Sequence, residues 1–178
     1  MQKNVMAMMC SIFFLFNHPA FAVTLPIDPV DSSVLFRINH DLGYTVGYFK
    51  DFTTTLDVKS DQTNITALKI LVKPESITTH NAIRDESLKS ALFLDIGNFK
   101  QATFESTTIE ADKIIGLLSI KGIAKPITFN IIQDVAGKKI ILRGTFNRND
   151  YGITFNTLLP NKKKLIGDVV DLIIELKL

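Results

Sequence analysis

The chain of 178 residues contains one cysteine, Cys10, and no tryptophan. Because Cys10 is the single cysteine, the chain can form no internal disulfide and offers no cluster of cysteine metal ligands. The motifs GxSxG, GxGxxG, GxxxxGKS/T, HxH and HExxH are also absent. The sequence therefore gives no anchor for a serine hydrolase, a phosphate-cradling loop or a two-histidine zinc site.

A strong excess of charge is lacking too, since 20 basic and 18 acidic residues leave a formal net charge of +2. A nucleic-acid-binding protein would carry a basic stripe, so we expect no nucleic-acid partner. One basic run exists, Lys162-Lys163-Lys164, directly after Pro160-Asn161. The run predicts a solvated turn, with contact to a membrane surface as the alternative.

Residues 1–22 have the organisation of a signal peptide: Lys3, an apolar run over 5–16, and a small-x-small ending at Ala22. We expect cleavage before Val23 and export to a bacterial periplasm. Because cleavage would remove Cys10, the exported chain would have no disulfide and would rely on its hydrophobic core for stability. An uncleaved membrane anchor is the alternative, although the apolar run is shorter than the about 20 residues that span a bilayer. The remaining residues, 23–178, have the length of one domain.

Alternation of apolar and polar residues dominates the chain from residue 34 onward and has the period of β-strands. The residues that share a face are Val34, Phe36, Ile38 and His40; Leu68, Ile70 and Val72; Ala102 and Phe104; Ile114, Gly116, Leu118 and Ile120; Ile127, Phe129 and Ile131; Ile140, Leu142, Gly144 and Phe146; and Val170, Leu172, Ile174 and Leu176. Turn-forming residues at 41–43, 61–64, 121–122, 137–138 and 149–152 separate these segments. The pattern predicts an all-β domain of roughly eight strands, and a sandwich and a closed barrel both fit it.

Residues 81–94 do not alternate. Leu88, Ala91 and Leu92 have helical spacing, Asn81 is a suitable N-cap, and Asp85 lies in the first turn, where the helix dipole favours anions. We expect a short helix that covers one end of the β domain.

Phenylalanine is abundant, with 13 residues, most of them on or beside predicted strands. Two interpretations fit this abundance, and periodicity does not separate them. The rings either pack in a solid core or line the cavity of a wide barrel that holds one long apolar ligand. Two histidines, His40 and His80, follow the apolar N-terminal segment, and their spacing favours a strand end and a loop over a metal site.

Four stretches, in order, resemble the YceI-like domain family. The first carries F-x-I/V-x-H and V-G-x-F, through Asp31, Phe36, Ile38, His40, Val46, Gly47 and Phe49. The second carries N-x-x-R-D-x-x-L-x-S-x-x-F-x-D and F-x-S, through Asn81, Arg84, Asp85, Leu88, Ser90, Phe93, Asp95, Phe104 and Ser106. The third is a hairpin with Gly116, Leu118, Ile120, Gly122, Lys125, Pro126 and Ile127, and the fourth is R-x-D-Y-G at Arg148, Asp150, Tyr151 and Gly152. Lys121 departs from the His or Arg common in the family, and 156–168 has no family motif.

The resemblance implies an antiparallel eight-stranded lipocalin-like β-barrel with a short helical insertion, exported to the periplasm and often a homodimer. It implies an enclosed isoprenoid lipid, such as an isoprenoid quinone or a prenyl phosphate, and no metal, other cofactor or catalysis. On this basis the expected apolar cavity residues are Phe36, Ile38, Phe49, Phe93, Phe104, Leu118, Phe129 and Phe146. The expected polar residues at the rim are Arg84, Asp85, Asn81 and His40.

Three functions stay open at this point. The first is a periplasmic binding protein or carrier for isoprenoid lipid. The second is a lipid-acting enzyme that uses His40 and Asp85 as an acid–base pair. The third is a stress-protective partner of a membrane electron-transfer protein. Arg84 and Asp85 also admit a structural interpretation, in which they lock the helix against the barrel and do not touch the ligand.

Overall fold

The computed structural model describes residues 22–59, 64–134 and 138–178. These residues form eleven strands, one α-helix and two short 3-10 helices. The strands are β1 (Ala22–Leu25), β2 (Asp28–His40), β3 (Gly43–Phe49), β4 (Phe52–Lys59), β5 (Ile65–Val72), β6 (Ile77–Thr78), β7 (Ala102–Ile109), β8 (Lys113–Ile120), β9 (Ile123–Asp134), β10 (Lys139–Asn147) and β11 (Ile166–Lys177). The helices are α1 (Ala82–Lys89), η1 (Pro74–Ser76) and η2 (Arg148–Tyr151). Apart from Ala22, which opens β1, the expected signal peptide lies outside the described residues.

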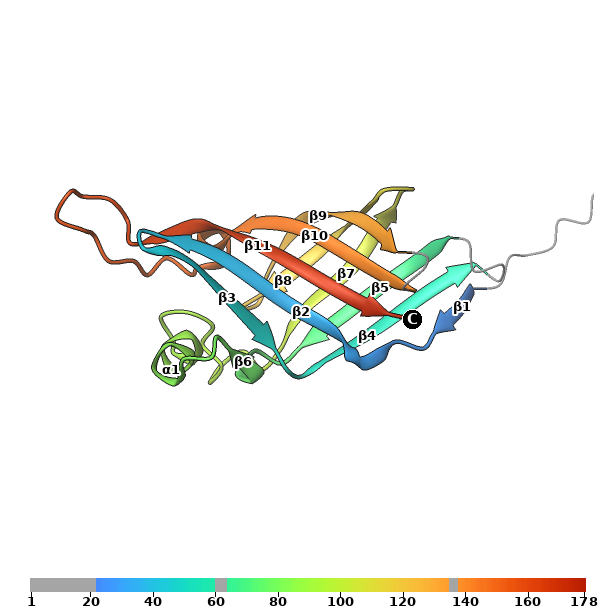
Figure 1. Ribbon diagram of the computed structural model, residues 1–178, viewed down its shortest axis with the longest axis horizontal. Helices are drawn as coiled ribbons and strands as arrows, with labels where there is room; N and C mark the ends of the chain where they lie inside the picture. The colour runs from blue at the N-terminus through green and yellow to red at the C-terminus, as the bar shows by residue number, and fades with distance from the viewer. Residues whose placement is uncertain (1–21, 60–63, 135–137) are drawn as a thin grey trace, which may run out of the picture.

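All strands belong to one antiparallel sheet, in the order β1-β4-β5-β7-β8-β9-β10-β11-β2-β3-β6. The sheet curls strongly into a half-barrel (Figure 1). Inside the sheet β11 pairs with β2, with Leu172 opposite Phe36, so that distant parts of the chain meet there. The predicted all-β domain with a short helical insertion is confirmed.

The predicted eight-stranded closed barrel is wrong in strand number and in closure. Consecutive strands β3 and β4 do not pair, because the chain between them bonds to the segment around η1: Lys50 N donates to Ser76 O and Lys73 N to Asp51 O. The short strand β6 then takes the open side of β3. The sheet therefore keeps two edges, at β1 and β6.

Three phenylalanine rings lie against glycines on neighbouring strands. A Cβ added at Gly47 would come 2.4 Å from Phe36, one at Gly116 2.6 Å from Phe104, and one at Gly144 2.9 Å from Phe129. Glycine in a strand makes room for a large ring and allows a sharp bend of the sheet. These contacts let bulky rings face inward inside a tightly curled sheet.

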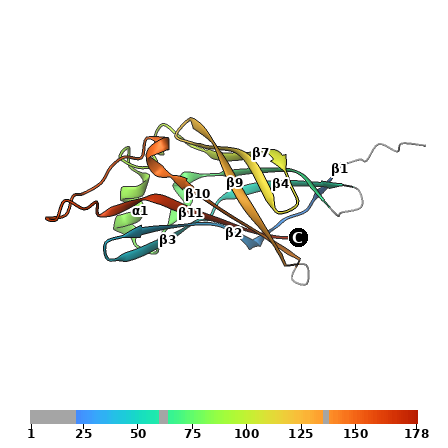
Figure 2. The same cartoon turned by 90° about the horizontal axis from the view of Figure 1, so that it is seen from above.

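The two ends of the half-barrel differ. At the end that holds β1 and the C-terminus, the inward side chains are packed solid, and Leu56, Ile114, Phe129, Leu142 and Leu176 are fully buried. At the opposite end lie α1, the β2–β3 turn and the loop before β11 (Figure 2). The side chains at this second end surround a cavity.

Helix α1 begins where the sequence predicts, because the Asn81 side chain accepts a hydrogen bond from Arg84 N at 3.0 Å as N-cap. It ends earlier than predicted, at Lys89, because Ser90 adopts an extended conformation. Turns continue from there to Asn98, and the backbone of Asp95 is left-handed at φ 50°. The predicted turn at Lys121-Gly122 is confirmed as the two-residue loop of the β8–β9 hairpin, in which both residues have positive φ.

Candidate lipid-binding cavity

The cavity has a volume of about 380 Å³, at the lower end of the range for small-molecule sites. Side chains from both walls of the sheet, from α1 and from the segment after α1 line it. The polar ones are His40, Thr45, Arg84, Ser87, Thr103 and Arg148. The rest of the lining is apolar, so the cavity suits an aliphatic ligand with a small polar end.

Most of the predicted apolar residues line this cavity. They are Phe36, Ile38, Phe49, Phe93, Phe104, Leu118 and Phe146. The structure places Phe129 outside the lining: its ring is fully buried and packs edge-on against Phe104, with 5.0 Å between ring centroids. Phe129 thus belongs to the solid core, next to a residue that faces the cavity.

Arg84 and Asp85 converge on Thr79 and not on each other. Arg84 Nε donates to Thr79 Oγ1 at 2.7 Å and Arg84 Nη2 to Thr79 O at 3.0 Å. Asp85 Oδ1 accepts from Thr79 N at 2.7 Å and from Thr79 Oγ1 at 2.5 Å. Burial, the largest single effect, would raise the pKa of Asp85, but the hydrogen bonds from Thr79 and Thr78 and the charge of Arg84 together lower it. This network ties α1 to the chain that follows β6.

The two residues nevertheless differ in what they face. Arg84 lines the cavity, whereas Asp85 and the N-cap Asn81 do not. Since only Nε and Nη2 of Arg84 are engaged by Thr79, the guanidinium keeps further N–H donors. Arg84 can therefore both hold α1 to Thr79 and offer donors at the cavity rim. Asp85 fixes α1 to Thr79, and Asn81 caps the helix.

His40 lies at the end of β2 and lines the cavity. Its Nδ1 accepts a hydrogen bond from Leu42 N at 3.3 Å, so a neutral ring carries its proton on Nε2. In the described part of the chain, no hydrogen bond or ion pair joins His40 to Asp85. The acid–base pair considered from the sequence therefore does not form.

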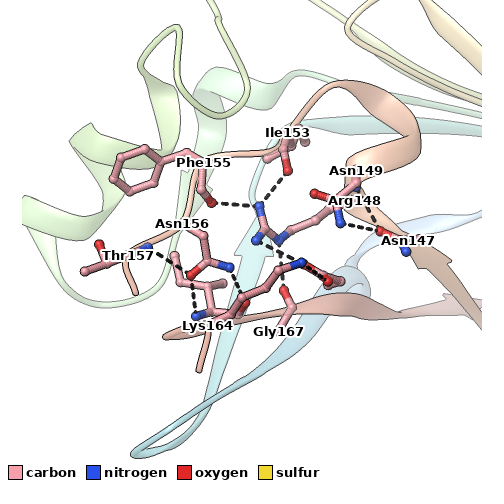
Figure 3. Close-up of polar contacts among 11 residues, drawn as sticks. Asn147, Arg148, Asn149, Ile153, Phe155, Asn156, Thr157, Lys164 and Gly167 are labelled. Carbon is pink, nitrogen blue, oxygen red and sulfur yellow. Dashed lines mark hydrogen bonds and ion pairs between the residues drawn. The ribbon is translucent and has the colours of Figure 1, made fainter. Parts of the chain in front are cut away.

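Arg148 is a cavity-lining cation that the sequence reasoning did not select. It is 3% exposed and donates to Gly167 O at 2.8 Å, Ile153 O at 2.6 Å and Phe155 O at 2.9 Å (Figure 3). Burial lowers the pKa of Arg148, and Asp168, at 3.4 Å from Nη2, opposes that effect. Strand parity was the available signal, because Arg148 continues the inward series 140, 142, 144 and 146.

The carbonyls that Arg148 holds flank a finger, which we define as residues 157–165. Leu165 N donates to Thr157 O at 2.8 Å, Leu159 N to Lys163 O at 2.9 Å, and Lys162 N to Leu159 O at 2.8 Å. Asn156 fixes the base by bonding both the N–H and the C=O of Ile166. The finger extends beyond the end of the sheet (Figure 1) and carries the exposed lysine run.

In the described residues, no group of three or more His, Cys, Asp or Glu side chains is arranged to hold a metal ion. Within the same residues, no helix has the length and apolar character that crossing a membrane would need.

Comparisons with known proteins agree with this architecture. The family model of the YceI-like domain matches residues 25–178. A UPF0312 protein of Staphylococcus aureus is 34% identical over 152 residues, which cover 79% of this chain and 88% of the relative.

Solved structures share the fold. BcnA of Burkholderia cenocepacia matches with a TM-score of 0.68 and 19% identity, over 85% of this chain and 98% of its own. A polyisoprenoid-binding domain from Saccharophagus degradans matches with a TM-score of 0.58 and 12% identity, over 85% and 96%. Since the family model spans nearly every described residue and a relative exceeds 30% identity, the chain belongs to the YceI-like domain family.

Proposed function

We propose that this protein binds and carries an isoprenoid lipid, with the tail in the cavity and the head group at its rim. The observation that carries the proposal is the apolar lining of a cavity open to solvent at one end, where exposed Leu42 belongs to the lining. The polyisoprenoid-binding domain of Saccharophagus degradans, which has the same fold, supports this ligand class. From the N-terminal sequence we further propose that the protein acts after export to the periplasm; the homodimer stays a prediction.

Burial of the tail would supply most of the affinity. Each buried CH₂ contributes about 0.8 kcal/mol, so about ten of them contribute roughly 8 kcal/mol. That gain alone corresponds to a Kd of about 1 μM. Lost freedom of the tail opposes it, and we therefore expect micromolar or weaker binding of short-tailed isoprenoids.

The head group would meet hydrogen-bond donors. Arg84 retains N–H groups beyond those used by Thr79, and His40 retains Nε2–H. A quinone carbonyl accepts one such bond, whereas a phosphate accepts two from a guanidinium. The donors therefore suit both isoprenoid quinones and prenyl phosphates.

A pair of tryptophan substitutions tests the proposal. Ile38 lines the cavity, whereas its neighbour Asn39 is exposed on the other face of β2. Ile38→Trp fills part of the cavity, and Asn39→Trp is the matched control. Displacing two CH₂ groups of a bound tail costs about 1.6 kcal/mol, roughly tenfold in affinity.

The measurement is lipid extraction and mass spectrometry of purified protein, followed by titration with an isoprenoid quinone and, separately, a prenyl phosphate. We expect native protein and Asn39→Trp to load alike and Ile38→Trp to load at least tenfold more weakly. Native protein that is empty and refuses both ligands would overturn the proposal. Equal loading of the two variants would place any bound lipid outside the cavity.

A further inference from the structure

Exposed apolar and basic side chains lie on the elements at the end of the half-barrel that holds the cavity. We call this region the mouth surface and define it by Leu42, Ile83, Leu158, Lys162 and Lys163. Leu42 is 87% exposed, Ile83 83% and Leu158 67%. They come from the β2–β3 turn, from α1 and from the finger, which lie at the same end of the molecule in both ribbon views (Figures 1 and 2).

We propose that the mouth surface docks on an anionic phospholipid bilayer, with Leu158 in the interface and Lys162 and Lys163 against the headgroups. The inference rests on the proposed function in one respect, since docking would bring the cavity to the membrane that holds its ligand. Scattered exposed apolar residues need no explanation. Apolar side chains beside unpaired lysines, around the opening of an apolar cavity, are the composition of an interfacial membrane anchor.

The charges of the finger suit an anionic surface. Lys164 pairs with Asp168 at 2.5 Å, whereas among the described residues no hydrogen bond or ion pair engages the side-chain amines of Lys162 and Lys163. The finger itself contains no acidic residue. The neighbouring β2–β3 turn carries one exposed carboxylate, Asp41, and it contacts the finger through its backbone, because Asp41 N donates to Leu165 O. In the finger and this turn together, two free lysines therefore outweigh one carboxylate.

The finger is attached firmly enough to orient the cavity. Its paired backbone leads into Leu165, which lines the cavity. Just before the finger, Phe155 packs edge-on against Phe93, another lining residue, at 5.3 Å between ring centroids. Arg148 holds Phe155 O and Gly167 O on the two sides of the base. A bilayer that captures the finger would thus face the cavity opening.

Two pairs of variants test the docking in the full-length chain. Lys162→Asn with Lys163→Asn is matched by Lys59→Asn with Lys138→Asn at the opposite end, which removes the same charge. Each pair includes one lysine with left-handed backbone, Lys162 at φ 61° or Lys138 at φ 49°, a conformation that asparagine tolerates. Leu158→Ser is matched by Val30→Ser, an 87% exposed apolar residue near the start of β2.

The assay is co-sedimentation with vesicles of phosphatidylcholine that contain a minority of phosphatidylglycerol, against pure phosphatidylcholine. A lysine near an anionic surface contributes about fivefold in binding, so the finger pair should lose roughly 25-fold. Leu158→Ser should lose about tenfold, and both controls should bind like the native chain. Binding should also fall as salt shortens the Debye length from about 10 Å at 0.1 M to about 3 Å at 1 M.

Failure of this inference differs from failure of the proposed function. Loading from detergent micelles, without a bilayer, measures the cavity alone, and every folded variant of the finger should load normally. Native protein that loads but ignores the anionic vesicles overturns docking only. Equal losses for the finger and the far-end lysines overturn it as well, because general charge attraction would then explain the binding. An empty protein that binds vesicles through the finger overturns lipid carriage and leaves docking supported.

Discussion

The buried guanidinium of Arg148 gives the sharpest stability prediction. Arg148→Met keeps an unbranched aliphatic stem and removes the donors to Ile153 O, Phe155 O and Gly167 O. Lysine would not replace it, because one ammonium lacks the planar fork that reaches several acceptors. The substitution therefore isolates the hydrogen-bonding role of the group.

The magnitude follows from the burial of the acceptors. The bond to Ile153 O is buried, so its loss leaves an unsatisfied carbonyl at a cost of about 2 kcal/mol. The other two are partly buried and water can reach them, at about 1 kcal/mol each. Relief from burying a cation opposes these losses. We expect a net decrease of about 3 kcal/mol in the free energy of unfolding.

Equilibrium unfolding in urea measures this decrease. With a denaturant slope of about 2 kcal/mol/M, the midpoint should fall by about 1.5 M and the slope should not change. Arg143→Met, on the exposed face of β10, the strand that leads into η2, is the control and should stay within about 0.5 kcal/mol of the native chain. A midpoint shift below about 0.3 M for Arg148→Met would refute the reasoning.

Two further predictions concern the polar networks. Thr79→Val retains the shape of a buried residue but removes the hydroxyl shared by Arg84 and Asp85; it should cost about 2 kcal/mol in urea unfolding, and Thr53→Val, on exposed strand surface, should cost little. An unchanged midpoint for Thr79→Val would show that the network contributes nothing. The hydrogen bond from Lys164, followed by that from Asn149, lowers the pKa of Asp168. A lowered folded-state pKa stabilises the fold above the unfolded value of about 3.9 and loses that contribution as the pH falls through the folded value. Asp168→Asn should therefore be less stable than the native chain at neutral pH, and the difference should shrink below about pH 4; a constant difference across that range would contradict the assignment.

Much of the fold could be predicted because side-chain parity in a strand is a local property. The inward positions of Ile114, Leu142 and Ile174 follow directly from alternation, and the structure buries all three. Closure could not be predicted in the same way. Whether β3 pairs with β4 depends on a contact with Ser76, more than twenty residues further along the chain. No local pattern records that contact.

The candidate site was predictable to a similar degree. Parity placed Phe36 and Phe104 inward, and both line the cavity. It also placed Phe129 inward, but parity does not report depth along the barrel, which separates solid core from cavity. Arg148 has the same inward parity, yet arginine is rarely buried without partners. Its partners are backbone carbonyls of the following loop, which residue types alone do not reveal.

The position of β11 has a consequence for how the molecule folds. This strand is the last in the sequence, yet it lies inside the sheet, between β10 and β2. Synthesis must therefore reach β11 before the strands on its two sides can join into one sheet. Such sequence-distant pairing predicts slow folding, on a timescale of milliseconds to seconds. Until β11 inserts, the edges of β2 and β10 stay unpaired, and a chain stopped before residue 166 would expose both of them to aggregation.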